Sequence, residues 1–143
     1  MRVEAGLLCV GLFGCAAHRA AETRPIPAGG NELQVGQAME DALEADGRSE
    51  PADSLYAPYA SIIADGRLRR GPPRYAGVSG GGEIAITNTQ LQMRGSVAWG
   101  TAEYRWESTR SNAASSGKAS FVLVPAQGRE GWWIVQAHSS TLR

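Results

Sequence analysis

Hydrophobic residues recur at spacings of three and four over residues 32–47, and this period predicts an amphipathic helix. The helix is expected to end at Gly47, a common stop residue. A second, short helix is predicted over residues 51–59, because a proline opens the segment and Leu55 and Tyr59 fall on one face. Tyr56 lies beside them on this predicted helix. The apolar positions of the first helix are Leu33, Val35, Met39, Ala42 and Leu43.

After residue 60 the pattern changes to alternation, which is typical of strands with one buried face. A short strand over residues 61–64 ends at Asp65-Gly66, a dipeptide favoured in tight hairpin turns. Residues 71–82 are rich in glycine and proline and predict a loop. Because this loop leads into a strand and not into a helix, the sequence excludes a phosphate-binding glycine loop here.

Longer strands are predicted over residues 84–93, 97–108, 119–125 and 132–140. Residues 111–117 are small and polar and predict a hairpin loop. Short turns between neighbouring strands require them to run antiparallel. Strands of this length coil strongly, so the sheet is expected to curve and to have a concave face. Alternation also places Trp132 and Trp133 on opposite faces, so one of them is expected to cover the outer face.

The first 31 residues differ in composition from the rest of the chain. Residues 1–14 combine Arg2 with a short apolar run, as export signals do. The ending Leu-Phe-Gly-Cys resembles the bacterial lipobox, which implies that Cys15 is lipidated. The alternatives are plain signal cleavage and a mis-assigned start codon. Residues 15–31 have the composition of a flexible linker, and residues 32–143 are expected to form a single domain. We expect an exported protein, either a membrane-anchored lipoprotein or a periplasmic protein.

Charge and composition narrow the class of partner. The chain has 14 basic and 14 acidic residues, and its net charge of zero gives no general attraction to nucleic acid. Both cysteines precede the domain, and no metal-ligand spacing is present, so neither a metal site nor a cofactor is predicted. Four arginines lie close together and suit either an acidic partner or a solvated loop. They are Arg67, Arg69, Arg70 and Arg74.

The last strand ends in a pattern that resembles Gly-x-Trp-x-Ile-Val-x-x-His-x-Ser, the common ending of SnoaL-like or DUF4440-type domains. The matching residues are Gly131, Trp133, Ile134, Val135, His138 and Ser140. With the elements before it, residues 32–143 resemble the nuclear transport factor 2-like (NTF2-like) superfamily. The resemblance implies a cone-shaped α+β fold, with N-terminal helices packed on a strongly curved antiparallel sheet. Many relatives have a third helix where this chain has its glycine- and proline-rich segment, so the pocket wall is expected to be thinner or more mobile there.

The resemblance also implies a cavity, which different relatives use as enzymes, carriers or oligomerisation domains, so the fold alone does not fix the function. His138 is the one histidine of the predicted domain and the candidate catalytic base, because imidazole titrates near neutral pH. On its strand it is expected to share a face with Gln136, Ile134 and Trp132. A base needs an orienting acid, and no motif in the sequence pairs His138 with one. The candidate acids are Asp53, Asp65, Glu103 and Glu107.

The predicted pocket residues are Tyr56, Tyr104, Trp106, Gln136 and His138. We expect an exported, lipid-anchored domain that binds a small apolar ligand or a partner protein without catalysis. The alternative is a SnoaL-type enzyme that performs proton transfer or hydration on a small apolar substrate. A homodimer through the sheet is also expected, with the lipid anchor as the one contact with the membrane.

Overall fold

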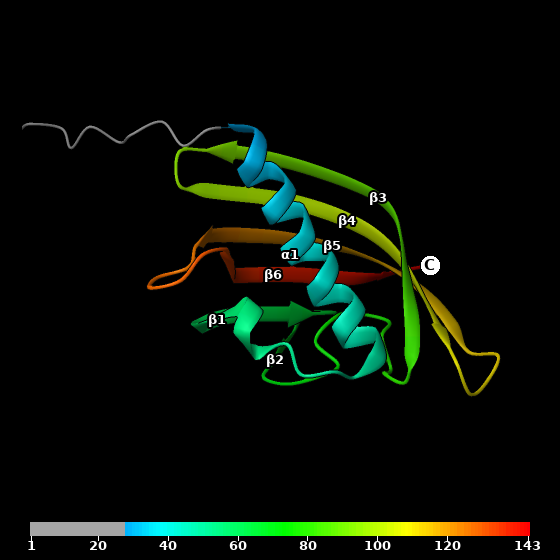
Figure 1. Ribbon diagram of the computed structural model, residues 1–143. Helices are drawn as coiled ribbons and strands as arrows, with labels where there is room; N and C mark the ends of the chain where they lie inside the picture. Colours follow the sequence, from blue (N-terminus) through cyan, green and yellow to red (C-terminus); the bar gives the residue numbers. More distant parts are fainter. Residues whose placement is uncertain (1–27) are drawn as a thin grey trace, which may run out of the picture.

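A computed structural model describes residues 28–143, which form one α-helix and one curved six-stranded sheet (Figure 1). The strands lie in the order β2-β1-β6-β5-β4-β3. Neighbours pair antiparallel except β1 and β6, which run parallel, so the predicted antiparallel sheet is confirmed apart from this pair. The predicted leader, including Cys15, lies outside the described residues. The elements are α1 (Ala28–Arg48), the 3-10 helix η1 (Asp53–Leu55), β1 (Tyr56–Ala64), β2 (Arg67–Arg69), β3 (Gly82–Arg94), β4 (Val97–Ser108), β5 (Ala114–Pro125) and β6 (Trp132–Leu142).

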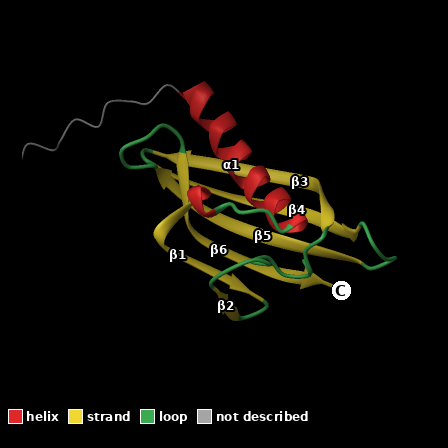
Figure 2. Ribbon diagram, turned by 60° about the horizontal axis from the view of Figure 1, so that its bottom comes forward, coloured by secondary structure: helices red, strands yellow, loops and turns green. Residues whose placement is uncertain are grey.

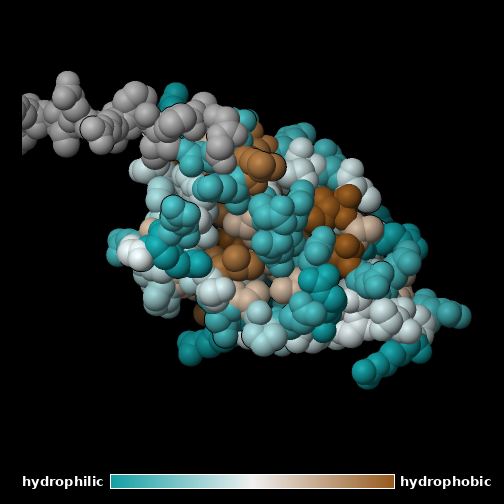
Figure 3. All heavy atoms as spheres, in the orientation of Figure 1, coloured by the Kyte–Doolittle hydropathy of each residue, from teal (hydrophilic) through white to brown (hydrophobic). Residues whose placement is uncertain are grey.

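Helix α1 lies diagonally across the concave face of the sheet (Figures 1 and 2). It begins at Ala28, earlier than the predicted start at residue 32. Met39 and Leu43 on its apolar stripe are fully buried, whereas Leu33 is 75% exposed. From the helix side, hydrophilic residues line the outer face of α1 and hydrophobic residues show beside it (Figure 3). Burial of this stripe against the sheet is therefore the main source of the helix's stability.

The second predicted helix, over residues 51–59, is wrong. The structure has only a single 3-10 turn there, and β1 begins at Tyr56. Tyr56 pairs with Ile134 of β6, and this parallel pairing overrides the local helical spacing. The β1–β6 register shifts between Tyr56 and Ser61. Pro58 lies within this irregular stretch, where a missing N–H group removes no ladder hydrogen bond.

The turn at Asp65-Gly66 is confirmed, and it is followed by a short strand that the sequence did not predict. Ala64 pairs with Arg67, so the turn has two residues, and both have positive φ angles, 47° and 74°. This is the backbone form that closes tight hairpins with the right-handed twist of the strands. β5 also begins earlier than predicted, at Ala114, which shortens the predicted hairpin loop over residues 111–117.

A bulge in β6 reverses the predicted faces of its second half. Val122 of β5 pairs with Gln136 and the next residue, Leu123, pairs with Ile134, so Val135 is an extra residue without a partner on β5. Before the bulge, Trp132 is buried and Trp133 is a half-buried residue of the outer face, as the alternation predicted. Beyond the bulge, Ala137 and Ser139 face inward, and Gln136 and His138 are exposed. The prediction that His138 shares a face with Trp132 and Ile134 is therefore wrong.

Large side chains fill the space between α1 and the sheet, so the interior of the cone is closed. Tyr104 extends inward from β4 and its hydroxyl donates to the carbonyl of Ala76 at 2.6 Å. Gly117, opposite Tyr104 on β5, leaves room for this ring, because a Cβ there would lie 2.5 Å from Tyr104 Cζ. The largest buried side chains include Met39, Leu43, Tyr75, Tyr104, Phe121, Leu123 and Ile134.

Candidate ligand-binding site

The segment between β2 and β3 buries two side chains on the inner side of the sheet, near β1. Arg74 and Tyr75 are 7% and 2% exposed although both lie in a loop without regular structure. The sequence predicted a thinner wall here, where many relatives have a third helix. In this chain the loop itself supplies the wall, and it does so with buried side chains.

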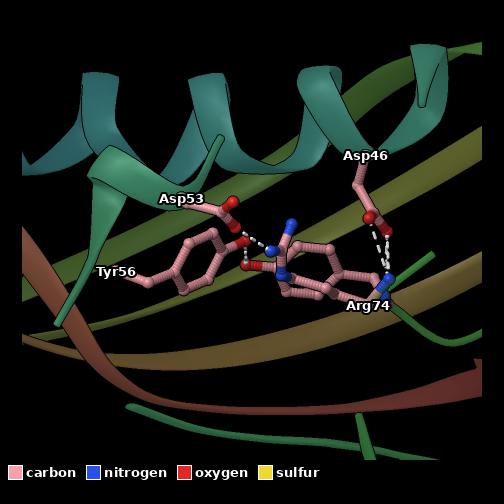
Figure 4. A network of polar contacts seen from close by, with 5 residues as sticks. Asp46, Asp53, Tyr56 and Arg74 are labelled. Carbon is pink, nitrogen blue, oxygen red and sulfur yellow. Dashed lines mark hydrogen bonds and ion pairs between the residues drawn. The ribbon is translucent and has the colours of Figure 1, made fainter. Parts of the chain in front are cut away.

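Asp46 near the end of α1 holds this loop in place (Figure 4). The carboxylate is 1% exposed and accepts the backbone N–H of Arg74 at 2.8 Å on both oxygens. It also accepts the backbone N–H of Tyr75 at 2.9 Å. Burial raises the pKa of Asp46 above its ordinary value, although these N–H groups act in the opposite direction. The backbone of the loop is thus fixed by a side chain from the helix.

Arg74 in turn is held by contacts on two sides. Its guanidinium carbon lies 4.7 Å from the centre of the Tyr56 ring, a cation–π distance. One of its N–H groups donates to Asp53, whose side chain is 84% exposed. Figure 4 shows Asp53 and Tyr56 next to the Arg74 side chain and Asp46 at its backbone. The cation is therefore positioned before any ligand binds.

Two tyrosines complete this polar cluster of Asp46, Asp53, Tyr56, Arg74 and Tyr75. The hydroxyls of Tyr56 and Tyr75 lie 2.9 Å apart and share a hydrogen bond. Burial raises the pKa of Tyr56 to about 12, and burial also raises the pKa of Tyr75. Both phenols are therefore neutral at physiological pH, and neither supplies a ready base.

A pocket of about 560 Å³ opens between this cluster, β1 and β2. Ile62 pairs with Ala137 on one side and with Arg69 on the other, so Arg69 projects from the inner face of the sheet. The volume falls in the range of small-molecule sites, roughly 300–1,000 Å³. Apolar lining comes from Ala57, Pro58, Ala60, Ile62 and Leu68, and polar lining from Asp53, Tyr56, Tyr59, Arg69, Arg70 and Arg74.

The structure brings together only part of the residue set predicted from the sequence. Tyr56 lines the pocket, but from β1 and not from a helix. Tyr104 and Trp106 are buried in the core and do not line this pocket. Gln136 and His138 lie exposed on the outer face of the sheet, beyond the β6 bulge. The five predicted residues therefore do not form one site.

The two aspartates that hold the pocket wall in place were not among the pocket residues predicted from the sequence. Asp46 follows Leu43 by three positions and thus continues the apolar stripe of α1, which was a usable signal for a buried acid. Asp53 was a candidate acid to orient His138, and no sequence pattern linked it to Arg74. The arginine cluster was noticed, and three of its four members, Arg69, Arg70 and Arg74, line the pocket.

Two further findings concern the described part of the chain. Residues 28–143 contain no group of three or more His, Cys, Asp or Glu side chains placed to hold a metal ion. Over the same range, no helix is both long and apolar enough to cross a bilayer.

No family model matches the sequence, and no curated protein matches it. Solved structures do match: an NTF2-like superfamily protein from Salmonella enterica superposes with a TM-score of 0.60 at 15% identity, covering 78% of this chain and 91% of that one. The CaMKII hub of S. rosetta superposes with a TM-score of 0.59 at 18% identity, covering 82% and 100%. An NTF-2 like protein of unknown function from Shewanella oneidensis gives 0.57 at 17% identity, covering 76% and 97%.

The chain has the NTF2-like fold. Its one helix on a curved sheet corresponds to the cone of these neighbours, and the predicted fold class is confirmed. At these identities the likeness concerns the fold, and the function has to be argued from the pocket of this particular NTF2-like chain.

Proposed function

We propose that this NTF2-like domain binds a small molecule, without catalysis, in the pocket between β1, β2 and the Arg74 loop. The observation that carries the proposal is the pre-formed wall of this pocket. A buried Arg74 is fixed through Asp46, Asp53 and Tyr56 on the rim of a cavity of about 560 Å³. A site with a rigid polar group and apolar walls binds small ligands at a low ordering cost.

The absence of catalysis is argued from the acids and bases near the pocket. Asp46 is buried behind the loop, and both its oxygens already accept backbone N–H groups. Asp53 is paired with Arg74. His138 lies on the opposite face of the sheet. A proton-transfer enzyme needs a free base within hydrogen-bond reach of its substrate, and these groups do not provide one.

The alternative function, a SnoaL-type enzyme for proton transfer or hydration, has one observation in its favour. Asp46 is a buried carboxyl with a raised pKa close to the Tyr56–Tyr75 pair, and such groups are frequent in active sites. It would act only if the loop moved away from it. Turnover of a bound ligand that stops in Asp46→Asn and survives in His138→Ala would favour this alternative.

The binding function can be tested by filling the pocket. The full chain is screened against a small-molecule library by ligand-detected NMR, and the hits are measured again with Ala60→Trp, which places a large ring among the lining residues. Ser120→Trp, an equal enlargement on an exposed outer-face position, is the matched control. We expect hits that lose binding in Ala60→Trp alone, with unchanged circular dichroism. Hits that bind equally to both variants contradict the proposed site.

A second proposed property is self-association through the outer face of the sheet. Trp99 pairs with Val122, and Val124 pairs with Trp133, so these cross-strand pairs form an apolar patch over β4, β5 and β6. Trp99 is 39% exposed there. The CaMKII hub neighbour, named as a hub, supports an oligomeric use of the fold. Light scattering should show a dimer for the wild type and a monomer for Trp99→Glu. The control Ser111→Glu, a change in an exposed loop, should remain a dimer. A monomeric wild type contradicts the proposed self-association.

The location of the protein is proposed from the leader alone. Residues 1–14 and Cys15 fit an export signal with lipidation. Because α1 begins at Ala28, the proposed tether between lipid and domain shortens from residues 15–31 to residues 15–27. Intact mass of the membrane fraction should show a processed chain that begins at a lipid-modified Cys15. An unprocessed chain with a free thiol contradicts the anchor.

A further inference from the structure

We infer that the pocket takes a ligand with an anionic group, a carboxylate or a phosphate monoester, joined to an apolar body. The inference rests on the proposed binding function and specifies the ligand class. It replaces the purely apolar ligand that the sequence suggested.

The charge of the pocket wall is the first argument. Three arginines line it, Arg69, Arg70 and Arg74, against one acidic residue, Asp53. Guanidinium groups present fork-shaped donors that match carboxylate and phosphate oxygens. An uncharged apolar ligand would displace water from Arg69 and Arg70 without offering a hydrogen-bond acceptor in its place, so the wall favours an anion.

The state of each arginine is the second argument. Within residues 28–143, Arg69 and Arg70 form no ion pair with a carboxylate. Arg74 is buried and pre-oriented, and its partner Asp53 is largely exposed, so an incoming anion can share the cation or displace the aspartate. Arg69 is attracted by the charges of Asp46 and Asp65, but neither carboxylate forms an ion pair with it. Arg74 therefore sets the position of the anion, and the exposed Arg69 and Arg70 can adjust to the ligand.

The apolar part of the lining is the third argument. Ala60 and Ile62 line the pocket together with the exposed ring of Tyr59. These side chains lie along β1, next to the arginines contributed by β2 and by the loop. A hydrocarbon or aromatic body would cover them while its acidic group contacts the arginines.

The test uses the full chain and matched probes that differ in charge. Octanoate and octyl phosphate carry the anion, octanamide and octanol are the neutral analogues, and inorganic phosphate is the anion without a body. Binding is measured by calorimetry for the wild type, for Arg69→Gln/Arg70→Gln and for the control Arg110→Gln, an exposed arginine in the β4–β5 loop. Both lost arginines are exposed, so the double variant is expected to fold normally.

We expect at least one amphipathic anion to bind to the wild type, and the neutral analogues to bind at least about tenfold more weakly. The double variant should lose about tenfold in affinity for that anion, the effect of losing one charged hydrogen bond. Preference for octanoate or for octyl phosphate identifies the acid. Equal binding of acid and amide overturns the anion inference and leaves the proposed binding function intact. Binding of no probe, or of inorganic phosphate as tightly as the amphipathic anions, overturns the inferred ligand class. An equal loss in Arg110→Gln overturns the assignment to this site.

Discussion

The concave side of the sheet has two parts with different covers. Over β3, β4 and β5 the apolar stripe of α1 packs against inward-facing side chains such as Phe121 and Leu123, and the space is filled. Beside β1 and β2 the cover is the loop of Arg74 and Tyr75, held by Asp46, and a pocket remains next to it. The same loop also contacts β4 and β6, through the hydrogen bonds of Ala76 with Tyr104 and Ser139. The filled part under the helix stabilises the fold, whereas the part beside the loop keeps the pocket in which we propose that a ligand binds.

The largest expected effect is in the helix-covered part. Leu43→Ala removes a fully buried side chain and leaves a cavity under α1, so we expect the free energy of unfolding to fall by about 3 kcal/mol. Chemical denaturation followed by circular dichroism measures the loss. Leu33→Ala on the same helix is the matched control, because Leu33 is 75% exposed and its loss should stay within about 0.5 kcal/mol. Equal losses would show that α1 is not packed as described.

The next effect is expected in the loop-covered part. Asp46→Asn keeps the shape of the side chain and one acceptor oxygen, but it places an amide NH₂ where a carboxylate oxygen accepts the N–H of Arg74. It also removes the negative charge from the remaining hydrogen bonds, and we expect a loss of about 2 kcal/mol in the free energy of unfolding. Because the loop wall would loosen, ligand affinity should fall as well. Asp41→Asn, an exposed acid on the same helix, should leave both quantities nearly unchanged. A variant that loses stability but keeps full ligand affinity would show that the Arg74 loop does not shape the binding pocket.

A smaller effect concerns the pH dependence of two aspartates. Burial raises the pKa of Asp46, so the extra stability that its protonation adds is full below the ordinary pKa of 3.8 and is lost as the pH rises through the raised value. The hydrogen bonds of the carboxylate to the loop remain above that pH. The backbone N–H of Thr141 lowers the pKa of the exposed Asp65, so its contribution is full above 3.8 and is lost as the pH falls. The difference in the free energy of unfolding between the wild type and Asp46→Asn should therefore shrink as the pH rises. The difference between the wild type and Asp65→Asn should grow as the pH rises. Parallel curves would contradict the described environments.

The sequence predicts the strands well where alternating buried and exposed residues lie between two turns. It does not predict the pocket. The predicted range 97–108 matches β4 because both ends carry turn residues and every second side chain is buried. Val135 gives no local sign of a bulge, since the bulge depends on pairing with β5. The local sequence around Tyr56 predicts a helix, and only the parallel pairing with Ile134 shows that this residue begins a strand. The pocket depends on contacts between Asp46 and Arg74, which are 28 residues apart and which no local pattern encodes.

The smallest expected effect is on the outer face, at the residue that the sequence favoured as a base. His138→Ala removes an exposed side chain from β6, so we expect the free energy of unfolding to change by less than about 0.5 kcal/mol. Ligand affinity should stay unchanged as well, because the sheet separates His138 from the pocket lined by Arg69 and Arg74. Denaturation and calorimetry on the same preparation measure both. A weakened ligand complex in His138→Ala, with Arg110→Gln unaffected, would place the binding site on the outer face and would reverse the roles of the two sides of the sheet.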